Sequence, residues 1–291
     1  MQANKRRQSR ALVYTFAMLG ILVSAGVYLV GHAQTEGIAP TTPTTHTNKG
    51  QAEKVAQDGA DSYNALLKKH VNAQGLVNYG ALKADRAGLD SYIKWLGSFT
   101  ADDYKDWSDP EKIAFWINAY NACTLQLLID HHPITDKPRI NQDEPANSIM
   151  QIDGAWKKFT FNLLDEDITL DSMEHKKLRV EFKEPRIHMA LVCGAVSCPY
   201  LRNEAYQAST LEAQLSDQTK TFLSLESNLK IEKSFLRKKV TISKIFDWFS
   251  SDFPDLNTFL GTYGPKEHQD FLKSGTYKTE FSGYSWLLNE Q

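Results

Sequence analysis

Residues 109–129 constrain the fold more than any other part of this chain. Asp109 suits the N-cap of a helix and Pro110 suits its first position, where the N–H that proline lacks would be unpaired anyway. The apolar residues that follow point in almost every direction around a helix: Ile113, Phe115, Trp116, Ile117, Tyr120, Leu125, Leu127, Leu128 and Ile129. A helix that is apolar all round is a buried helix. We therefore expect it to run through the core.

The other segments predict a mixture of helices and strands. The predicted helices cover about 52–70, 80–99, 210–225, 245–251 and 254–262, with a short one from Asp171. The predicted strands cover about 158–163, 167–170, 187–193, 228–232 and 239–243. Helices and strands are segregated and do not alternate regularly. We therefore expect an α+β fold in which the central apolar helix packs on a small, mostly antiparallel sheet.

Residues 1–33 predict a membrane anchor or a signal segment. Four basic residues lie within the first ten positions, and an uncharged run from Ala11 to Gly31 follows, about the length that a transmembrane helix needs. Basic flanks stay in the cytoplasm. We therefore expect a single-pass cell-membrane protein with its globular part outside the cytoplasm, in the periplasm if the source is a Gram-negative bacterium. Cleavage after Ala33 would release that part, but signal cores span only about 7–15 residues, which favours retention.

Residues 34–50 are predicted to form a polar tether, and residues 51–291 a single globular domain. The tether is rich in proline and threonine and too poor in apolar residues to pack. The chain has 33 basic and 35 acidic side chains; four of the basic ones and none of the acidic ones lie in the first ten residues, so the rest carries a formal charge of −6. An acidic body without a basic stripe excludes nucleic-acid binding. The expected partners are the membrane, through the N-terminal helix, and a peptide or protein of the cell envelope.

The chemistry of this chain is expected in residues 186–201, which place a histidine and two cysteines around an apolar run and a glycine turn. Cys198 is the favoured nucleophile, because small residues precede it and Pro199 could open a helical turn that lowers the pKa of the thiol. Cys193 ends the predicted strand and is expected to be packed at the binding site. An inert pair or a disulfide is the alternative in an oxidising compartment. Cys123, in the central helix, is expected to fill the core.

His175, His188 and Glu174 are the candidate acid–base groups. An unperturbed imidazole has a pKa close to neutral, so either histidine could take the proton of a thiol. His188 shares one side of the predicted strand with small apolar residues, where it is either a site residue or hydrogen-bonded core. Glu174 has a structural alternative, because it follows Asp171 with the spacing of a capping box.

Asn118 and Asn121 are three residues apart on the central helix and so lie close to one face. Buried amides need partners. Asn118 could orient an imidazole, as a side-chain amide does in some catalytic triads, and Asn121 could line a binding site with Trp116. We prefer the simpler interpretation, in which both amides tie an irregular loop to the helix and Trp116 belongs to the core.

Several blocks of the sequence resemble the bacterial and plant domain-of-unknown-function family 547. The blocks are Phe115–Ala122, Leu170–His175 with Leu178-Arg179, Arg186–His188 with Cys193–Ala195 and Ser197–Pro199, Ile245–Phe249, and Tyr284–Asn289. They span most of the chain after the tether and stand in the family's order. The family has no assigned role, so this resemblance implies a fold and no particular reaction.

A more distant resemblance is to papain-like and transglutaminase-like thiol enzymes. It implies a cysteine nucleophile and a histidine base on a related core. In those folds the cysteine usually precedes the histidine along the chain, whereas here His175 and His188 precede Cys193 and Cys198. The resemblance therefore implies a rearranged order of the core elements.

Two functions of different classes follow and remain open. The first is a membrane-tethered thiol hydrolase or acyltransferase acting on a peptide or amide, in which Cys198 attacks, His175 or His188 takes the thiol proton, and Asn118 or Glu174 holds the imidazole. The second is a non-enzymatic envelope module, a binding or scaffold protein whose His/Cys loop is structural. A zinc site is disfavoured because no short Cys-x-x-Cys or His-x-x-x-His pair is present. We expect no metal and no cofactor.

Overall fold

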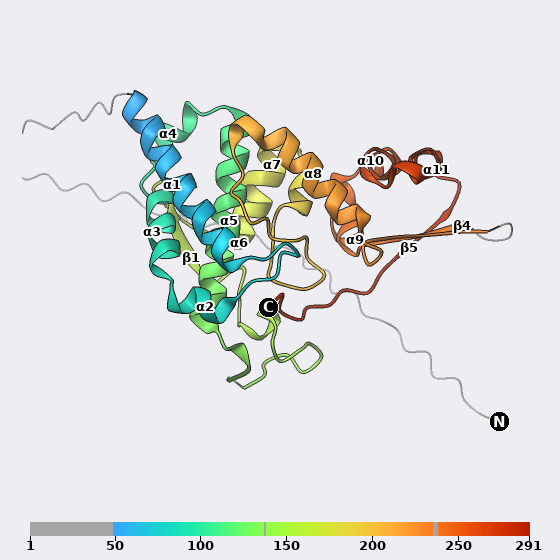
Figure 1. The fold of residues 1–291 in the computed structure, drawn as a ribbon, viewed down its shortest axis with the longest axis horizontal. Helices are drawn as coiled ribbons and strands as arrows, with labels where there is room; N and C mark the ends of the chain where they lie inside the picture. Colours follow the sequence, from blue (N-terminus) through green and yellow to red (C-terminus); the bar gives the residue numbers. More distant parts are fainter. Residues whose placement is uncertain (1–48, 137, 235–237) are drawn as a thin grey trace, which may run out of the picture. The chain divides into compact units, whose positions relative to one another are not determined.

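A buried helix, α5 (Asp109–His131), organises the fold (Figure 1). The structure is a computed structural model that describes residues 49–136, 138–234 and 238–291. Every residue from Ile113 to Leu125 is buried, as the sequence predicted. A capping box starts the helix: Ser108 accepts the backbone N–H of Glu111, and the Glu111 carboxylate accepts the N–H of Ser108 at 2.7 Å. The N-cap is therefore Ser108, one residue before the predicted Asp109.

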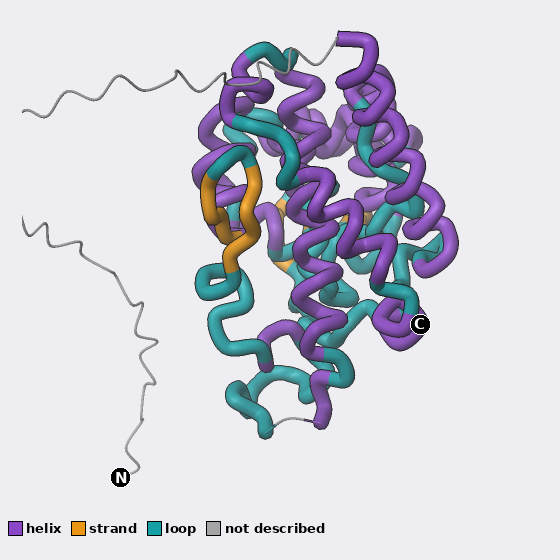
Figure 2. The backbone as a smooth tube through the Cα atoms, turned by 90° about the vertical axis from the view of Figure 1, so that its left-hand side faces the viewer, coloured by secondary structure: helices purple, strands orange, loops and turns teal. Residues whose placement is uncertain are grey.

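Helices predominate among the described residues, and the strands are short (Figure 2). The other α-helices are α1 (Lys49–His70), α2 (Tyr79–Ala84), α3 (Ala87–Leu96), α4 (Ala101–Lys105), α6 (Leu170–Ser172), α7 (Arg179–Phe182), α8 (Leu211–Ser224), α9 (Ile245–Trp248), α10 (Leu256–Tyr263) and α11 (Gln269–Ser274). The strands are β1 (Thr160–Leu163), β2 (Glu166–Thr169), β3 (Leu229–Lys233), β4 (Lys238–Ile242) and β5 (Lys278–Phe281). The predicted α+β class is confirmed.

The strands form two small sheets. β1 and β2 make an antiparallel hairpin, in which Thr160 pairs with Thr169. In the second sheet the order is β3-β4-β5, with β3 antiparallel and β5 parallel to β4. The mostly antiparallel character agrees with the prediction, and the parallel β4–β5 pair was not foreseen.

The predicted helix over 80–99 is broken into α2 and α3. The break lies at Asp85, whose backbone N–H bonds back to Ala81 and closes α2. The Asp85 carboxylate accepts hydrogen bonds from Lys69 at 2.5 Å and from His70 at 3.1 Å. These contacts fix the side chain to the end of α1, so a tertiary interaction sets the break that the apolar periodicity did not signal.

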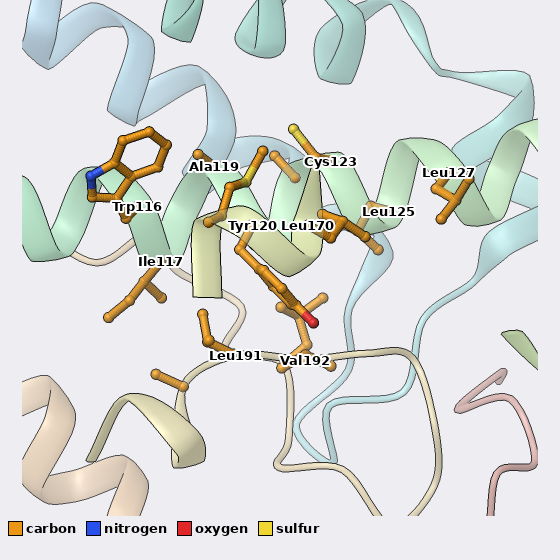
Figure 3. Packing of buried hydrophobic residues seen from close by; sticks show 14 of the residues in the cluster. Trp116, Ile117, Ala119, Tyr120, Cys123, Leu125, Leu127, Leu170, Leu191 and Val192 are labelled. Atoms are coloured by element: carbon orange, nitrogen blue, oxygen red, sulfur yellow. The ribbon is translucent and has the colours of Figure 1, made fainter. Parts of the chain in front are cut away.

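The buried apolar residues form two clusters. The larger core surrounds α5, which packs against α2, α3, α6 and the π-helical turn η3 (Met173–Leu178); Figure 3 shows part of it around Trp116 and Tyr120. The β1–β2 hairpin adds Leu163 and Ile168 to this core. The smaller core consists of Met189, Phe222, Leu223, Leu229, Val240, Ile242, Ile245, Phe246, Phe253, Leu260 and Leu272.

The predicted transmembrane segment at 11–31 lies outside the described residues, as do the predicted leader over 1–33 and most of the tether. Within the described ranges, no helix combines the length and the apolar character that crossing a bilayer requires. On this finding we correct the prediction: the transmembrane helix, the membrane as a partner, and the single-pass location with a periplasmic domain are withdrawn.

Candidate functional site

One cavity of about 390 Å³ gathers most of the side chains that the sequence marked for chemistry. Five of the candidates line it: Cys193, Cys198, Glu174, His175 and His188. The rest of its wall is formed by Tyr120, Met150, Trp156, Lys157, Asp171, Leu191, Pro199, Ile245, Trp248, Phe249, Tyr284 and Trp286. The wall is mostly apolar, and the thiols, carboxylates and imidazoles are its main polar features.

Asn121 of α5 holds the backbone that leads into the cysteine loop. Its amide donates to the Ala190 carbonyl at 3.0 Å and accepts the N–H of Val192 at 2.9 Å. The strand predicted over 187–193 is therefore wrong: the segment begins in the 3-10 helix η4 (Pro185–Met189) and then runs irregularly. A side-chain amide takes the place of a neighbouring strand in pairing the buried backbone.

A tight turn at Gly194 brings the two cysteines together. Gly194 has φ of +81°, and a Cβ atom there would lie 2.5 Å from Cδ1 of Leu128. Glycine alone fits both the dihedral angle and the space. The backbone N–H of Cys198 then reaches the carbonyl of Ala195 at 3.0 Å. No helix starts at Pro199, so the predicted helical N-terminus beside the Cys198 thiol is wrong.

The C-terminal strap, residues 284–291, pairs with the backbone of this turn, where the N–H of Asn289 donates to the carbonyl of Gly194 at 2.8 Å. The N–H of Val196 donates to the carbonyl of Leu287 at 2.7 Å. This pairing positions Tyr284 and Trp286 as part of the cavity wall. A segment about ninety residues downstream of the cysteines thus supplies two aromatic side chains of the cavity wall.

Tyr284 bridges the two thiols. Its hydroxyl donates to Sγ of Cys198 at 3.2 Å and lies 3.5 Å from Sγ of Cys193. The backbone N–H of Cys193 also donates to Sγ of Cys198, at 3.1 Å. Both cysteines are free, and Cys198 is only 7% exposed while Cys193 is half-buried. The sequence had assigned greater access to Cys198, and the structure reverses that order.

These contacts shift the pKa values of the two thiols in opposite directions. Burial would raise the pKa of Cys198, but hydrogen bonds from the Cys193 thiol, the Tyr284 hydroxyl and two backbone groups outweigh it and lower that pKa to about 7. The same hydrogen bond to Cys198, together with burial, raises the pKa of Cys193 well above its usual value. Cys198 is therefore the thiol that is more readily ionised.

Glu174 enters the cavity from the π-helical turn η3. It does not form the capping box that its spacing suggested, because the N–H of Asp171 donates to the Trp156 carbonyl at 3.0 Å. Thr169 caps this short helix in its place by accepting the N–H of Ser172 at 3.2 Å. The Glu174 side chain is thus free of the backbone, and burial raises its pKa to about 7.

His188 is held by Asp252 and stacks on Phe249 with ring centroids 4.0 Å apart. Its Nε2 lies 2.8 Å from Oδ2 of Asp252, and its Nδ1 lies 3.9 Å from Oε1 of Glu174. Arg179 holds the Asp252 carboxylate through two hydrogen bonds, which lower its pKa. Burial lowers the pKa of His188 to about 4. At neutral pH the imidazole is therefore neutral, with its proton on Nε2 and the Nδ1 acceptor turned toward Glu174.

His175 lies at the edge of the cavity, with 38% of its side chain exposed. Arg179 donates to its Nδ1 at 2.9 Å, and its Nε2 lies 3.8 Å from Oδ1 of Asp171. Partial burial lowers the pKa of His175. Because Arg179 occupies this acceptor nitrogen, His175 is poorly placed to take a proton from a thiol through Nδ1.

Neither imidazole forms a hydrogen bond with a thiol among the residues that the structure describes: the partners of the sulfurs are Tyr284, each other and the backbone. Glu174 is one of the groups whose pKa the charge of Cys198 raises. In the described part of the chain, no cluster of three or more His, Cys, Asp or Glu side chains is arranged to hold a metal ion. The cavity thus contains a thiol whose pKa is lowered and a carboxyl group whose pKa is raised.

Asn118 and Trp116 do not line the cavity. Asn118 donates to the carbonyl of Tyr206 at 2.8 Å and accepts its N–H at 2.9 Å, so it ties a different loop to α5. Trp116 is fully buried, and its indole N–H donates to the hydroxyl of Tyr104 at 2.8 Å. The preferred interpretation of the two asparagines as loop ties agrees with these contacts, and Trp116 lies in the core.

The sequence reasoning missed Tyr284, Asp252 and Arg179. Tyr284 and Arg179 lie in or beside blocks that resemble the family, but no chemical pattern marked them. Asp252 comes directly after the helix predicted over 245–251, where no chemical pattern marked it either. Their roles depend on pairing across the fold, which neither periodicity nor local spacing reveals.

Residues 104–223 match the model of a family described as "Protein of unknown function, DUF547". The resemblance to domain-of-unknown-function family 547 is confirmed over that segment, which holds α5, Glu174, both histidines and both cysteines of the cavity. No curated protein and no solved structure matches the chain. The papain-like or transglutaminase-like core is not confirmed.

Proposed function

We propose that the cavity is the active site of a thiol hydrolase or acyltransferase that acts on a peptide or another amide. One observation carries the proposal: the sulfur of Cys198 accepts hydrogen bonds from Tyr284 and from the Cys193 N–H in a cavity that also contains Glu174. Two donors stabilise a thiolate, which is the nucleophilic form. A carboxyl group with a pKa of about 7 can both give and take a proton at neutral pH.

In this mechanism the Cys198 thiolate attacks the amide carbonyl carbon. The C–N bond then breaks, and the leaving amine takes a proton from Glu174. The acyl group stays on sulfur as a thioester. The Glu174 carboxylate then takes a proton from water or a second amine as that nucleophile attacks the carbonyl carbon, the C–S bond breaks, and the Cys198 thiolate leaves. His188, neutral and fixed by Asp252, presents Nδ1 toward Glu174 and positions that carboxyl group.

The aromatic wall favours an apolar or aromatic acyl group. Trp286 packs edge-on against Trp156, with ring centroids 5.9 Å apart, and stacks on Trp248 at 5.8 Å. Trp248 is 45% exposed, so part of this surface is open to a ligand. Burying a ring against these indoles would supply binding energy that the few polar groups of the wall do not.

Single-turnover acylation of the full chain tests the proposal. The protein would be mixed with p-nitrophenyl esters of acetate and of phenylacetate, and intact and peptide masses would be followed. We expect acylation at Cys198, saturable with ester concentration, faster with phenylacetate, and followed by release of the acid. Cys198→Ser should not be acylated, and Cys123→Ser, altered only inside the core, should behave as the parent.

Acylation elsewhere, or a rate that rises linearly with ester concentration, would reject an active site at Cys198. The second candidate function is a non-enzymatic binding module, and the partly open aromatic wall is the observation that supports it. It predicts that phenylacetamide quenches tryptophan fluorescence while no ester is turned over.

A further inference from the structure

In the proposed acyl transfer, the thiol of Cys193 forms no bond to the acyl group. Cys193 lies on the cavity wall beside Cys198, and the Cys193 thiol hydrogen-bonds to the Cys198 sulfur. Tyr284 contacts both sulfurs, at 3.2 Å and 3.5 Å. Cys123, by contrast, is fully buried in α5. The structure thus pairs two free thiols at one opening and leaves the third in the core.

We propose that Cys193 and Cys198 form a dithiol that reduces small disulfide compounds by thiol–disulfide exchange. The activity is additional to acyl transfer: it shares the reactive sulfur of Cys198 but needs neither an acyl substrate nor Glu174.

The exchange has two steps. The Cys198 thiolate attacks one sulfur of a disulfide R–S–S–R; that S–S bond breaks, a Cys198–S–S–R bond forms, and RS⁻ leaves and takes up a proton. The Cys193 thiol then loses its proton and attacks the Cys198 sulfur, which breaks the mixed disulfide and releases the second thiol. The compound gains two electrons and two protons and becomes two thiols, and the protein is oxidised to a Cys193–Cys198 disulfide.

The turn geometry supports the second step. Only four residues separate the cysteines, and the left-handed backbone at Gly194 folds them back on each other. The N–H of Cys193 lies 3.1 Å from the Cys198 sulfur, so the two residues already meet without a hinge motion. An intramolecular thiol held this close competes strongly with any thiol in solution.

The acidity of the pair matches the order of the steps. The attacking thiol, Cys198, has the lowered pKa, and the resolving thiol, Cys193, has the raised one. A low-pKa thiol is the one that is ionised at neutral pH and attacks first. Tyr284, which contacts both sulfurs, can donate a hydrogen bond to the sulfur that carries negative charge.

Exchange with bis(2-hydroxyethyl) disulfide tests the proposal on the full chain. The reduced protein, freed of reductant, would be mixed with the compound, quenched with acid at intervals and weighed intact. We expect a mixed disulfide on Cys198 that decays to an internal disulfide, which peptide mapping assigns to Cys193 and Cys198, with release of both thiols. In Cys193→Ala the mixed disulfide should persist at least about tenfold longer, since no internal thiol resolves it. Cys123→Ala should behave as the parent.

Equal lifetimes of the mixed disulfide in the parent and in Cys193→Ala would overturn the proposal, as would a first adduct on Cys193. If Cys193→Ala does not fold, Cys193→Ser and the peptide map of the parent decide the same question. The two proposals can fail separately. Acylation of Cys198 without an internal disulfide would leave acyl transfer standing alone, and an internal disulfide without ester turnover would leave the exchange standing alone.

Discussion

The larger core and the smaller core differ in what they contribute to the cavity. The larger core is built on one long helix whose residues Ile113–Leu125 are all buried, whereas the smaller core is assembled from short helices and a three-stranded sheet. The larger core fixes backbone: Asn121 and Leu128 of α5 set the course of the cysteine loop. Residues near the smaller core and on the strap supply side chains that tune it, such as Asp252 and Tyr284.

The two regions meet at η4. Ile187 and Ala190 pack into the larger core, and Met189, between them, packs into the smaller one. His188 is thus held from both sides. The family match ends at residue 223, so it covers the loop with its thiols and stops before Asp252 and Tyr284. The larger core therefore holds the backbone of the cysteine loop, whereas side chains outside that core adjust the acidity of the cavity groups. The following variants test this division.

The largest expected effect on stability comes from replacing a tryptophan of the larger core, and we compare it with a replacement in the cavity wall. Trp116→Ala removes a fully buried indole from the larger core, and we expect a loss of about 3–5 kcal/mol in the free energy of unfolding. Trp248→Ala, at a site 45% exposed, should lose less than about 1 kcal/mol but weaken the binding of phenylacetamide. Urea unfolding and fluorescence titration measure the two properties. Equal losses of stability in the two variants would contradict the distinction between the larger core and the cavity wall.

A smaller effect is expected from Glu174→Gln and depends on pH. Burial raises the pKa of Glu174 to about 7 in the folded state, against about 4.3 in the unfolded chain. Between these values the folded state holds a proton that the unfolded state has lost, so stability falls as pH rises through the window, by on the order of 3 kcal/mol. The glutamine variant lacks this contribution.

Urea unfolding at pH 5 and pH 8 measures it. Relative to the parent, Glu174→Gln should lose less stability between the two pH values, and Glu267→Gln, at an exposed position, should follow the parent. If the parent and Glu174→Gln show the same pH dependence of stability, burial does not raise the pKa of the Glu174 carboxyl group.

The smallest effect is expected from Tyr284→Phe, which tests whether the C-terminal strap influences the Cys198 thiol. Removing the hydroxyl takes away a donor to the Cys198 sulfur, so the pKa of the thiol should rise. A hydrogen bond worth about 1 kcal/mol corresponds to a roughly fivefold slower alkylation at pH 7. The pH profile of iodoacetamide alkylation measures this shift. Tyr277→Phe, whose hydroxyl bonds to Asn257 and the Leu272 carbonyl, is the matched control. A profile unchanged in Tyr284→Phe would contradict the strap's influence on the thiol.

Much of the fold could be predicted because local pattern and tertiary structure agree there. The helices α5 and α8 and the strands β1, β2, β3 and β4 lie close to the positions that apolar spacing predicted. The segment 187–193 failed because an apolar run bounded by proline and glycine suits a strand or any buried segment whose backbone is otherwise paired. Here the pairing comes from the Asn121 amide, a long-range contact that periodicity does not encode.

For the candidate site, the sequence pointed to side chains that the structure gathers in one cavity, and it missed most of their partners. Cys198, Glu174 and His188 were marked by residue type and proximity along the chain. Asp252 and Tyr284 come from segments 54 to 86 residues after Cys198 and act only through packing. Asn118 was assigned to the same task as Asn121, because helical spacing places both near one face without saying which loop each one meets.

The C-terminal strap also ties the acidity of a thiol to pairing between distant segments. Its backbone pairs with Val77, Asn147 and Gly194. Because this strap carries Tyr284, local detachment of residues 284–291 would take the hydroxyl away from the Cys198 sulfur while α5 stays folded. Opening of the strap would therefore raise the pKa of the Cys198 thiol.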